Sequence, residues 1–163
     1  MQDKIGWIGL GSMGNRMAKN LAKNGYQMLV ADKMDTSAAP QSAHVATTNS
    51  EVISEANILI LSIPAGPDTL EITQEILNSP SSSVEIVIDT STIGIPDAKQ
   101  AAELLSKKGI EYVDAPVSGG IAGADSATLA VMVGCKADIF EKVQPILKCI
   151  GANIFHVGPN PGQ

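Results

Sequence analysis

Aromatic side chains, cysteine and histidine are scarce in this sequence. Phe, Trp and Tyr make up 3% of the 163 residues, and there are two cysteines and two histidines. Cys135 and Cys149 lie far apart and lack metal-ligand spacing, so we expect reduced, partly buried thiols rather than a disulfide framework. His44 and His156 have no cluster of Cys, Asp or Glu beside them in the chain, so we expect neither a metal site nor a histidine base.

Long hydrophobic runs and an excess of basic residues are also missing. No apolar stretch approaches the roughly 20 residues that span a bilayer. The first residues, Met1 to Lys4, lack the layout of a signal peptide. The formal net charge of −6 disfavours nucleic acid and anionic membranes as partners. We therefore expect a cytoplasmic protein that binds neither nucleic acid nor a membrane.

Apolar strand patterns alternate with helical patterns along the chain. Hydrophobic residues make up 44% and charged residues 17% of the sequence, which fits a buried parallel sheet whose strands are continuous apolar runs. The alternation predicts an α/β fold with a Rossmann-like, doubly wound and mostly parallel sheet in one domain over residues 1–163. Strands are expected at 5–10, 26–31, 57–63, 84–88, 110–113, 129–133 and 152–157, helices at about 13–25, 70–77, 95–108 and 138–150, and a loop at 114–120.

A glycine-rich stretch, Gly9-Leu-Gly-Ser-Met-Gly14, separates the first expected strand from the first expected helix. The motif alone is weak evidence, but an acidic residue, Asp32, follows the second strand at close to the spacing of a dinucleotide fingerprint. Gly9 would allow the tight turn, Gly11 the approach of a pyrophosphate, and Gly14 the close packing of helix on strand. The helix N-terminus would offer free N–H groups to the phosphates. The sequence thus predicts a dinucleotide-binding domain; the alternative is a glycine-rich turn without a ligand.

The acidic residue after the second strand bears on the choice of dinucleotide. The Asp32 carboxylate could accept both ribose hydroxyls of NAD, and it would repel the additional phosphate of NADP. The neighbouring Lys33 could partly compensate that phosphate, and Asp32 could also be a turn residue only. We expect NAD as the cofactor, with NADP as the alternative.

Further polar motifs directly follow expected strands. These are Ser62-Ile-Pro64, Thr90-Ser-Thr92 and Pro116 to Gly120, and ligands of open α/β sheets bind beyond the carboxyl ends of the strands. We therefore expect the motifs to face one crevice. Ser91 or Thr92 could instead cap the next helix. The Ser118-Gly-Gly120 step could be an ordinary turn, although a hydroxyl and two unshielded amides suit a carboxylate.

Three segments together resemble one known family. Ile8-Gly-Leu-Gly-Ser-Met-Gly-Asn-Arg-Met-Ala-Lys-Asn-Leu21 resembles its cofactor signature, with Arg16 where proline is common. Asp89-Thr-Ser-Thr-Ile93 resembles the segment that reaches the nicotinamide, and the stretch from Asp114 to Gly134 resembles the substrate-binding signature. The family is that of the β-hydroxyacid dehydrogenases, which includes 3-hydroxyisobutyrate dehydrogenase, tartronate semialdehyde reductase and, more distantly, 6-phosphogluconate dehydrogenase.

The resemblance implies reversible oxidation of a β-hydroxy acid, or reduction of the corresponding semialdehyde, by hydride transfer to or from the nicotinamide. It implies that Ser118, Gly119 and Gly120 hold the substrate carboxylate. The catalytic lysine and an all-helical domain would follow Gln163, so no catalytic residue is expected within these residues, and the parent enzyme would be a homo-oligomer. The expected cofactor contacts are Gly9, Leu10, Gly11, Met13, Gly14, Asp32, Ser62, Pro64 and Thr92.

Two readings remain from different classes. The first is the cofactor domain of such a dehydrogenase, acting on a small-molecule hydroxy acid. Residues 110–134 contain no basic side chain, which disfavours 6-phosphogluconate as the substrate. The second is a non-catalytic nucleotide-binding or scaffold module of the same fold.

Overall fold

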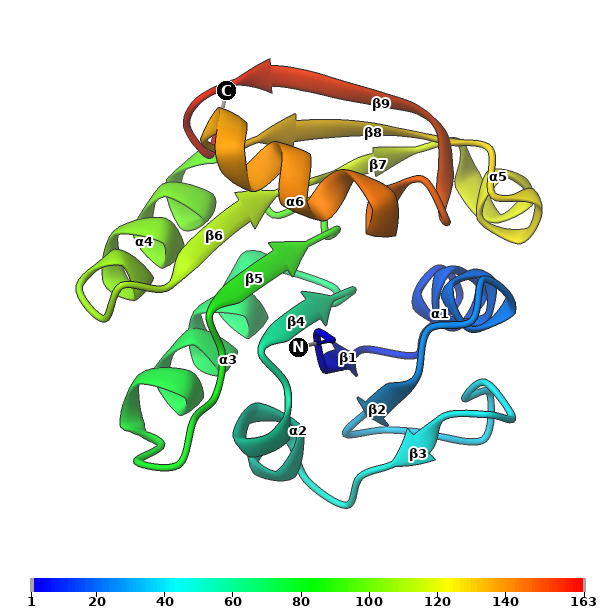
Figure 1. Ribbon diagram of the computed structural model, residues 1–163, viewed down its shortest axis with the longest axis horizontal. Coiled ribbons are helices and arrows are strands. Elements are labelled where there is room, and N and C mark those ends of the chain that lie inside the picture. The colour runs from blue at the N-terminus through cyan, green and yellow to red at the C-terminus, as the bar shows by residue number, and fades with distance from the viewer. Residues whose placement is uncertain (1, 163) are drawn as a thin grey trace.

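Strands and helices alternate along residues 2–162, the part of the chain that the computed structural model describes (Figure 1). Continuous apolar runs such as that of β4 form the strands, and amphipathic segments form the helices. The strands are β1 (Ile5–Ile8), β2 (Met28–Ala31), β3 (His44–Val45), β4 (Ile58–Leu61), β5 (Ile86–Asp89), β6 (Glu111–Asp114), β7 (Val117–Ser118), β8 (Leu129–Gly134) and β9 (Gly151–Gly158). The helices are α1 (Gly14–Lys23), α2 (Asn49–Glu55), α3 (Gly66–Asn78), α4 (Ile95–Ser106), α5 (Gly120–Ser126) and α6 (Ala137–Leu147).

All the strands belong to one sheet of order β3-β2-β1-β4-β5-β6-β8-β7, with β9 on β8. Neighbours from β3 to β6 are parallel, β8 is antiparallel to β6 and β7, and β9 is parallel to β8. The strand order reverses between β1 and β4, which is the switch point where such sheets bind ligands. The expected Rossmann-like, doubly wound and mostly parallel α/β fold is confirmed.

The last residues of the central strands are level with one another. Ile8 pairs with Ala31 and Leu61, Leu61 pairs with Asp89, and Asp89 pairs with Asp114. The segments that follow these strands therefore leave the sheet from one edge. This register places segments from distant parts of the sequence along one edge of the sheet.

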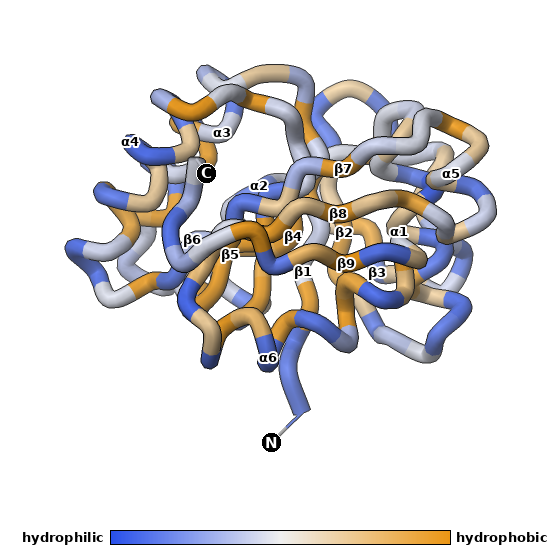
Figure 2. The backbone as a smooth tube through the Cα atoms, turned by 90° about the horizontal axis from the view of Figure 1, so that it is seen from above, coloured by the Kyte–Doolittle hydropathy of each residue, from blue (hydrophilic) through white to orange (hydrophobic). Residues whose placement is uncertain are grey.

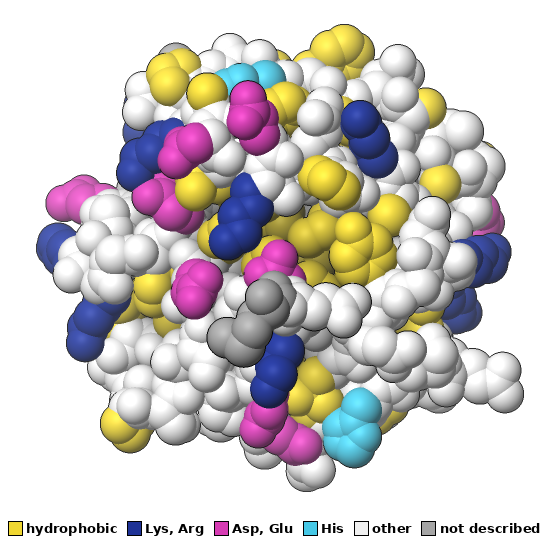
Figure 3. Space-filling model, in the orientation of Figure 1, with side chains coloured by type: hydrophobic (Ala, Val, Ile, Leu, Met, Phe, Trp, Pro, Cys, Tyr) yellow, Lys and Arg dark blue, Asp and Glu magenta, His cyan; other side chains and the backbone are white. Residues whose placement is uncertain are grey.

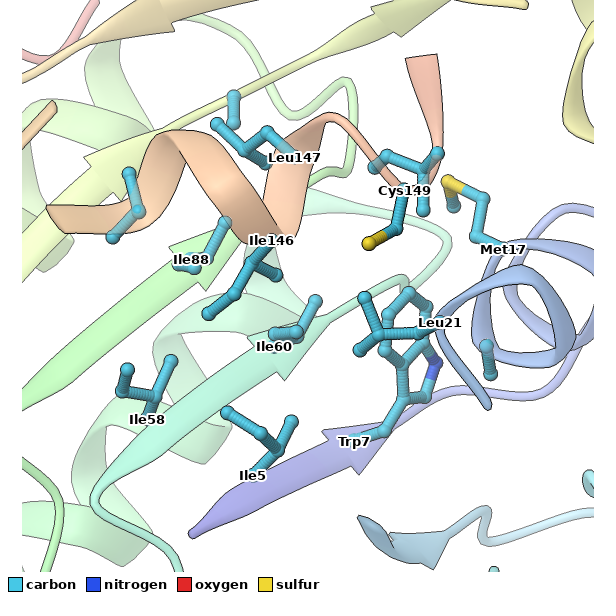
Figure 4. Close-up of a cluster of buried hydrophobic side chains, with 14 of the residues drawn as sticks. Ile5, Trp7, Met17, Leu21, Ile58, Ile60, Ile88, Ile146, Leu147 and Cys149 are labelled. Carbon is cyan, nitrogen blue, oxygen red and sulfur yellow. The ribbon is translucent and has the colours of Figure 1, made fainter. Parts of the chain in front are cut away.

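Helices cover both faces of the sheet (Figure 1). One core packs α1, α5 and α6 against one face, and the other packs α2, α3 and α4 against the opposite face. Within β4 the alternation is direct, because Ile58 and Ile60 belong to the first core and Leu59 and Leu61 to the second. Figure 4 shows the first core, where Trp7 of β1 lies against Leu21 of α1.

The surface carries side chains of both charges. In Figure 2 the hydrophobic colour concentrates on the central strands, whereas the outer turns of the helices are mostly hydrophilic. On the face shown in Figure 3, lysines and arginines are interspersed with carboxylates rather than gathered in one patch. None of the helices within residues 2–162 is long and apolar enough to cross a membrane.

Several expected boundaries were wrong. The segment 114–120 was expected to be a loop, but it contains β7 and the first residue of α5. The helices expected at 95–108 and 138–150 end at Ser106 and Leu147, each followed by a turn. The short elements β3, α2 and α5 were not expected at all.

Candidate functional site

A cavity of about 620 Å³ opens beside the carboxyl ends of β1, β2 and β4. Its size is that of a typical small-molecule site, and it lies at the switch point of the sheet. The lining consists of residues 8–16, 32–35 and 62–64 with Asn49, Asp68, Glu71, Ile72 and Glu75. The structure therefore gathers the glycine turn, the Asp32 segment and the Ser62–Pro64 loop around one space.

The three glycines of the turn have different surroundings. Gly9 has a φ of +106°, and a Cβ there would lie 1.9 Å from the carbonyl oxygen of Ser62. A Cβ on Gly14 would lie 2.1 Å from the carbonyl oxygen of Gly9. A Cβ on Gly11 would meet no protein atom within 4 Å. Gly9 and Gly14 are thus required by the packing of the turn, whereas the space beside Gly11 is open.

The turn leads directly into the N-terminus of α1. Its N-cap residue, Met13, makes no side-chain cap hydrogen bond, and no acidic residue occupies the first turn of the helix. The positive end of the helix dipole is thus left for an anion. The buried indole N–H of Trp7, on β1, donates to the Gly9 carbonyl at 2.8 Å. This bond holds the first glycine of the turn against the end of β1.

Asp32 holds the segment that follows β2. Its Oδ2 accepts from the backbone N–H of Leu10 at 2.6 Å, and its Oδ1 accepts from those of Met34 at 2.7 Å and Asp35 at 3.1 Å. Partial burial raises the pKa of Asp32, but the three backbone donors outweigh it and hold that pKa below its ordinary value. A carboxylate has about four acceptor positions, so roughly one stays available to a ligand hydroxyl.

These bonds predict a pH-dependent stability contribution. Because the folded-state pKa of Asp32 is depressed, the contribution is present above the unfolded-state pKa of about 3.9 and is lost as the pH falls through the lower folded-state value. Asp32→Ala should therefore lower the free energy of unfolding by about 1–2 kcal/mol at pH 7. Urea unfolding followed by Trp7 fluorescence measures the difference in the free energy of unfolding between the unmodified protein and this variant. We expect that difference to be constant from pH 8 to about 5 and to shrink below about pH 4. A difference that grows in acid would contradict the stabilising role of the ionised Asp32 carboxylate.

Acidic side chains dominate the outer lining of the cavity. The two cations there are already paired: Lys33 Nζ lies 3.4 Å from Asp68 Oδ1, and Arg16 Nε lies 2.8 Å from Asp125 Oδ1. The carboxylates that line the cavity are those of Asp32, Asp35, Asp68, Glu71 and Glu75. The rim on the β2 side is thus unfavourable for a second anionic group beyond a pyrophosphate.

The structure separates the other expected site residues into two groups. Ser62 and Pro64 line the cavity, whereas Thr92 and the Ser118–Gly120 step do not. Thr92 is exposed, and α4 begins at an N-cap glycine, Gly94, without a side-chain cap bond. Neither Ser91 nor Thr92 therefore caps that helix.

The Ser118–Gly120 step is also more than a turn. Ser118 pairs with Ala130 in the sheet, and Gly119, with a φ of +139°, precedes the first residue of α5. All three residues of the step are exposed. The step therefore lies at the surface, between the edge strand β7 and α5.

Two polar residues of α1 that were not expected at the site join this helix to α5. Arg16 Nη1 donates to the Ser12 carbonyl at 2.7 Å while its Nε faces Asp125 of α5. The buried Asn20 donates to the Ala124 carbonyl at 2.6 Å. Arg16 stands where the sequence departs from the resembled signature, and that departure was the available signal.

Comparisons with known proteins agree with this geometry. Residues 4–158 match the family described as the NAD binding domain of 6-phosphogluconate dehydrogenase. A 2-(hydroxymethyl)glutarate dehydrogenase of Eubacterium barkeri is 39% identical, over 95% of this chain and 53% of the relative. A 3-hydroxyisobutyrate dehydrogenase of Pseudomonas aeruginosa is 36% identical, over 94% of this chain and 53% of the relative.

A solved structure agrees as well. The 3-hydroxyisobutyrate dehydrogenase of Mycobacterium tuberculosis, determined with L-serine, is similar with a TM-score of 0.89 and 33% identity, over 98% of this chain and 56% of that one. The chain spans about half the length of the curated relatives that it matches. The family match covers nearly all of residues 2–162 and includes the glycine turn, Asp32 and the strand order around them. The chain belongs to the family of NAD-binding domains of 6-phosphogluconate dehydrogenase.

Proposed function

We propose that this chain binds NAD as part of a dehydrogenase that oxidises a β-hydroxy acid or reduces the corresponding semialdehyde. The observation that carries the proposal is the open space beside Gly11, which faces a cavity at the switch point and the uncapped N-terminus of α1. A pyrophosphate fits this space, because backbone N–H groups and the helix dipole would surround it. Asp32, on the neighbouring strand, would accept from a ribose hydroxyl.

The charges of the rim favour NAD over NADP. Asp32 is ionised at neutral pH because its pKa is depressed, and a 2′-phosphate would bring about −1.5 to −2 further charges beside it. Lys33 could attract that phosphate, but it already faces Asp68. NADP remains the alternative cofactor.

The proposed substrate is a small acid with a hydroxymethyl group next to the carbon that carries its carboxylate. This unit is common to 3-hydroxyisobutyrate, 2-(hydroxymethyl)glutarate and L-serine, after which similar dehydrogenases are named. The exposed Ser118 hydroxyl and the amides of Gly119 and Gly120 would hold the carboxylate, as the resemblance implies. Residues 110–134 contain no Lys, Arg or His, so this segment offers nothing to a substrate phosphate.

The residues of the site would bind and orient the cofactor and the substrate. The nicotinamide would supply the hydride acceptor when bound. The open space beside Gly11 would hold the pyrophosphate, and Asp32 would hold the adenosine ribose. Ser118 would bind the substrate. The alkoxide that develops during oxidation needs a general base, and we assign that role to a lysine in the sequence that follows Gln163. An all-helical domain there would close the pocket, and the assembled enzyme would be a homo-oligomer.

A titration with NADH in the presence and absence of a hydroxy acid tests this proposal. We expect 3-hydroxyisobutyrate or L-serine to bind the NADH-loaded protein. A separate absorbance assay with NAD as the hydride acceptor should find no oxidation of either acid by residues 1–163 alone. Ser118→Ala should weaken hydroxy acid binding roughly 10- to 150-fold, the effect of one hydrogen bond to a charged group, and leave NADH binding unchanged. NADH binding without any response to a hydroxy acid would favour the non-catalytic nucleotide-binding module instead.

A further inference from the structure

A single buried carboxylate lies behind the segments that follow β4 and β5. Asp89, the last residue of β5, is fully buried. Its Oδ2 accepts from the hydroxyls of Thr69 on α3 at 2.8 Å and of Tyr112 on β6 at 2.9 Å, and its Oδ1 accepts from the backbone N–H of Ser91 at 2.9 Å. The carboxylate therefore joins a helix, a neighbouring strand and the turn after its own strand.

The Ser91 hydroxyl extends this connection to a second loop. Its Oγ accepts from the backbone N–H of Ile63 at 2.8 Å, so the turn after β5 is tied to the loop after β4. One residue earlier, the Thr90 hydroxyl donates to the Leu61 carbonyl at 2.7 Å. Both loops are thereby fixed relative to each other by side chains that are almost inaccessible to solvent.

Apolar packing alone would not require this arrangement. Burial raises the pKa of Asp89 even though Ser91, Thr69 and Tyr112 donate to it. Burial and the nearby Asp89 raise the pKa of the Tyr112 hydroxyl, which therefore stays protonated and can donate. Buried polar networks of this kind are costly, and their benefit is a fixed geometry.

The fixed loops lie where the second half of a dinucleotide would extend. Asp32 is at the end of β2 and the Gly11 space is beyond β1, so a cofactor held at both points continues along the sheet edge towards β4 and β5. Ile63 and Pro64 follow β4, and Ser91 and Thr92 follow β5. We propose that Asp89 and Ser91 are positioning residues that hold these two loops in place for the nicotinamide half of the cofactor. This inference rests on the proposed binding of NAD.

Ser91→Ala tests the inference, because it removes the hydroxyl that joins the loops, and with it the side-chain hydrogen bond of Ser91 to Asp89. Thr69, Tyr112 and the backbone N–H of residue 91 still donate to Asp89. The probes are NADH and ADP-ribose, which lacks the nicotinamide, both titrated by calorimetry. We expect the affinity for NADH to fall roughly 3- to 10-fold, the effect of one hydrogen bond, while that for ADP-ribose stays within about twofold. Tyr112→Phe should shift the ratio of the two affinities in the same direction and by less.

Thr73→Val is the matched control. The Thr73 hydroxyl is also buried, but it donates to the Thr69 carbonyl within α3 and touches neither loop. The control should leave the ratio of the two affinities unchanged. The inference would be overturned if Ser91→Ala weakened the binding of both ligands equally or of neither. It would also be overturned if Thr73→Val showed the same selective loss of NADH affinity. Failure of the unmodified protein to bind either ligand would instead overturn the proposed function.

Discussion

Gly11→Val is expected to abolish measurable binding of NADH and NADPH while the protein stays folded. The space beside Gly11 holds no protein atom within 4 Å, and its backbone is not among those with positive φ. Valine is therefore compatible with the fold, yet its branched side chain would occupy the room that a pyrophosphate needs. Losing two or more hydrogen bonds to a charged group should weaken binding by about 100-fold or more.

Calorimetric titration measures the loss, and circular dichroism with Trp7 fluorescence reports on the fold. Gly9→Ala is the contrasting variant, because its Cβ would collide with the Ser62 carbonyl. The φ of +106° at this position also disfavours any residue but glycine. It should destabilise the protein, whereas Gly11→Val should not. Retained dinucleotide binding in a folded Gly11→Val variant would mean that the turn has only a structural role.

Asp32→Ala is expected to remove the preference for NAD. The unmodified protein should bind NAD at least about tenfold more tightly than NADP, a difference of about 1.4 kcal/mol, because in the proposed complex the ionised carboxylate would lie beside the 2′-phosphate. The alanine variant should bind both with similar affinity. The ratio of the two dissociation constants is the informative quantity, since the loss of three backbone hydrogen bonds affects both complexes alike.

Lys33→Gln is the matched control for this experiment. Lys33 faces Asp68 and is 68% exposed at its side chain, so its removal should change the ratio by less than about twofold, as expected of a weak surface pair. Equal or tighter binding of NADP by the unmodified protein would contradict the preference. A large effect of Lys33→Gln with none of Asp32→Ala would assign the choice to the lysine.

The parallel sheet was predictable because its buried strands are continuous apolar runs separated by helical patterns. β4, Ile58–Leu61, is apolar throughout and fully buried, so its pattern has one interpretation. β3 consists of His44 and Val45, both exposed, and a strand of two exposed residues leaves no periodic signal. Helix α5 was missed because two glycines at its start, Gly119 and Gly120, are typical of a turn rather than a helix.

One missed helix did have a signal in the sequence. Thr48-Asn-Ser-Glu51 has the spacing of a capping box, and Thr48 Oγ1 accepts from the Glu51 N–H at the start of α2. The departure from the signature at Arg16 marked a position but did not identify Asp125 as its partner. The contacts of Asp89 had no signal in the sequence, because they join residues from different elements. Local patterns therefore predict the turn and the strands, whereas the contacts behind the site depend on the packed fold.

A crystal structure of the protein with NAD is the most direct test of the central claim, that the cavity at the switch point holds the dinucleotide. We expect the pyrophosphate beside Gly11 at the N-terminus of α1, a ribose hydroxyl on Asp32, and the nicotinamide half directed towards Pro64 and Thr92. A cofactor bound elsewhere would contradict the claim, for example one in the cavity near Tyr26 and His44 at the amino ends of β1 and β2. So would a cofactor whose pyrophosphate lies away from Gly11.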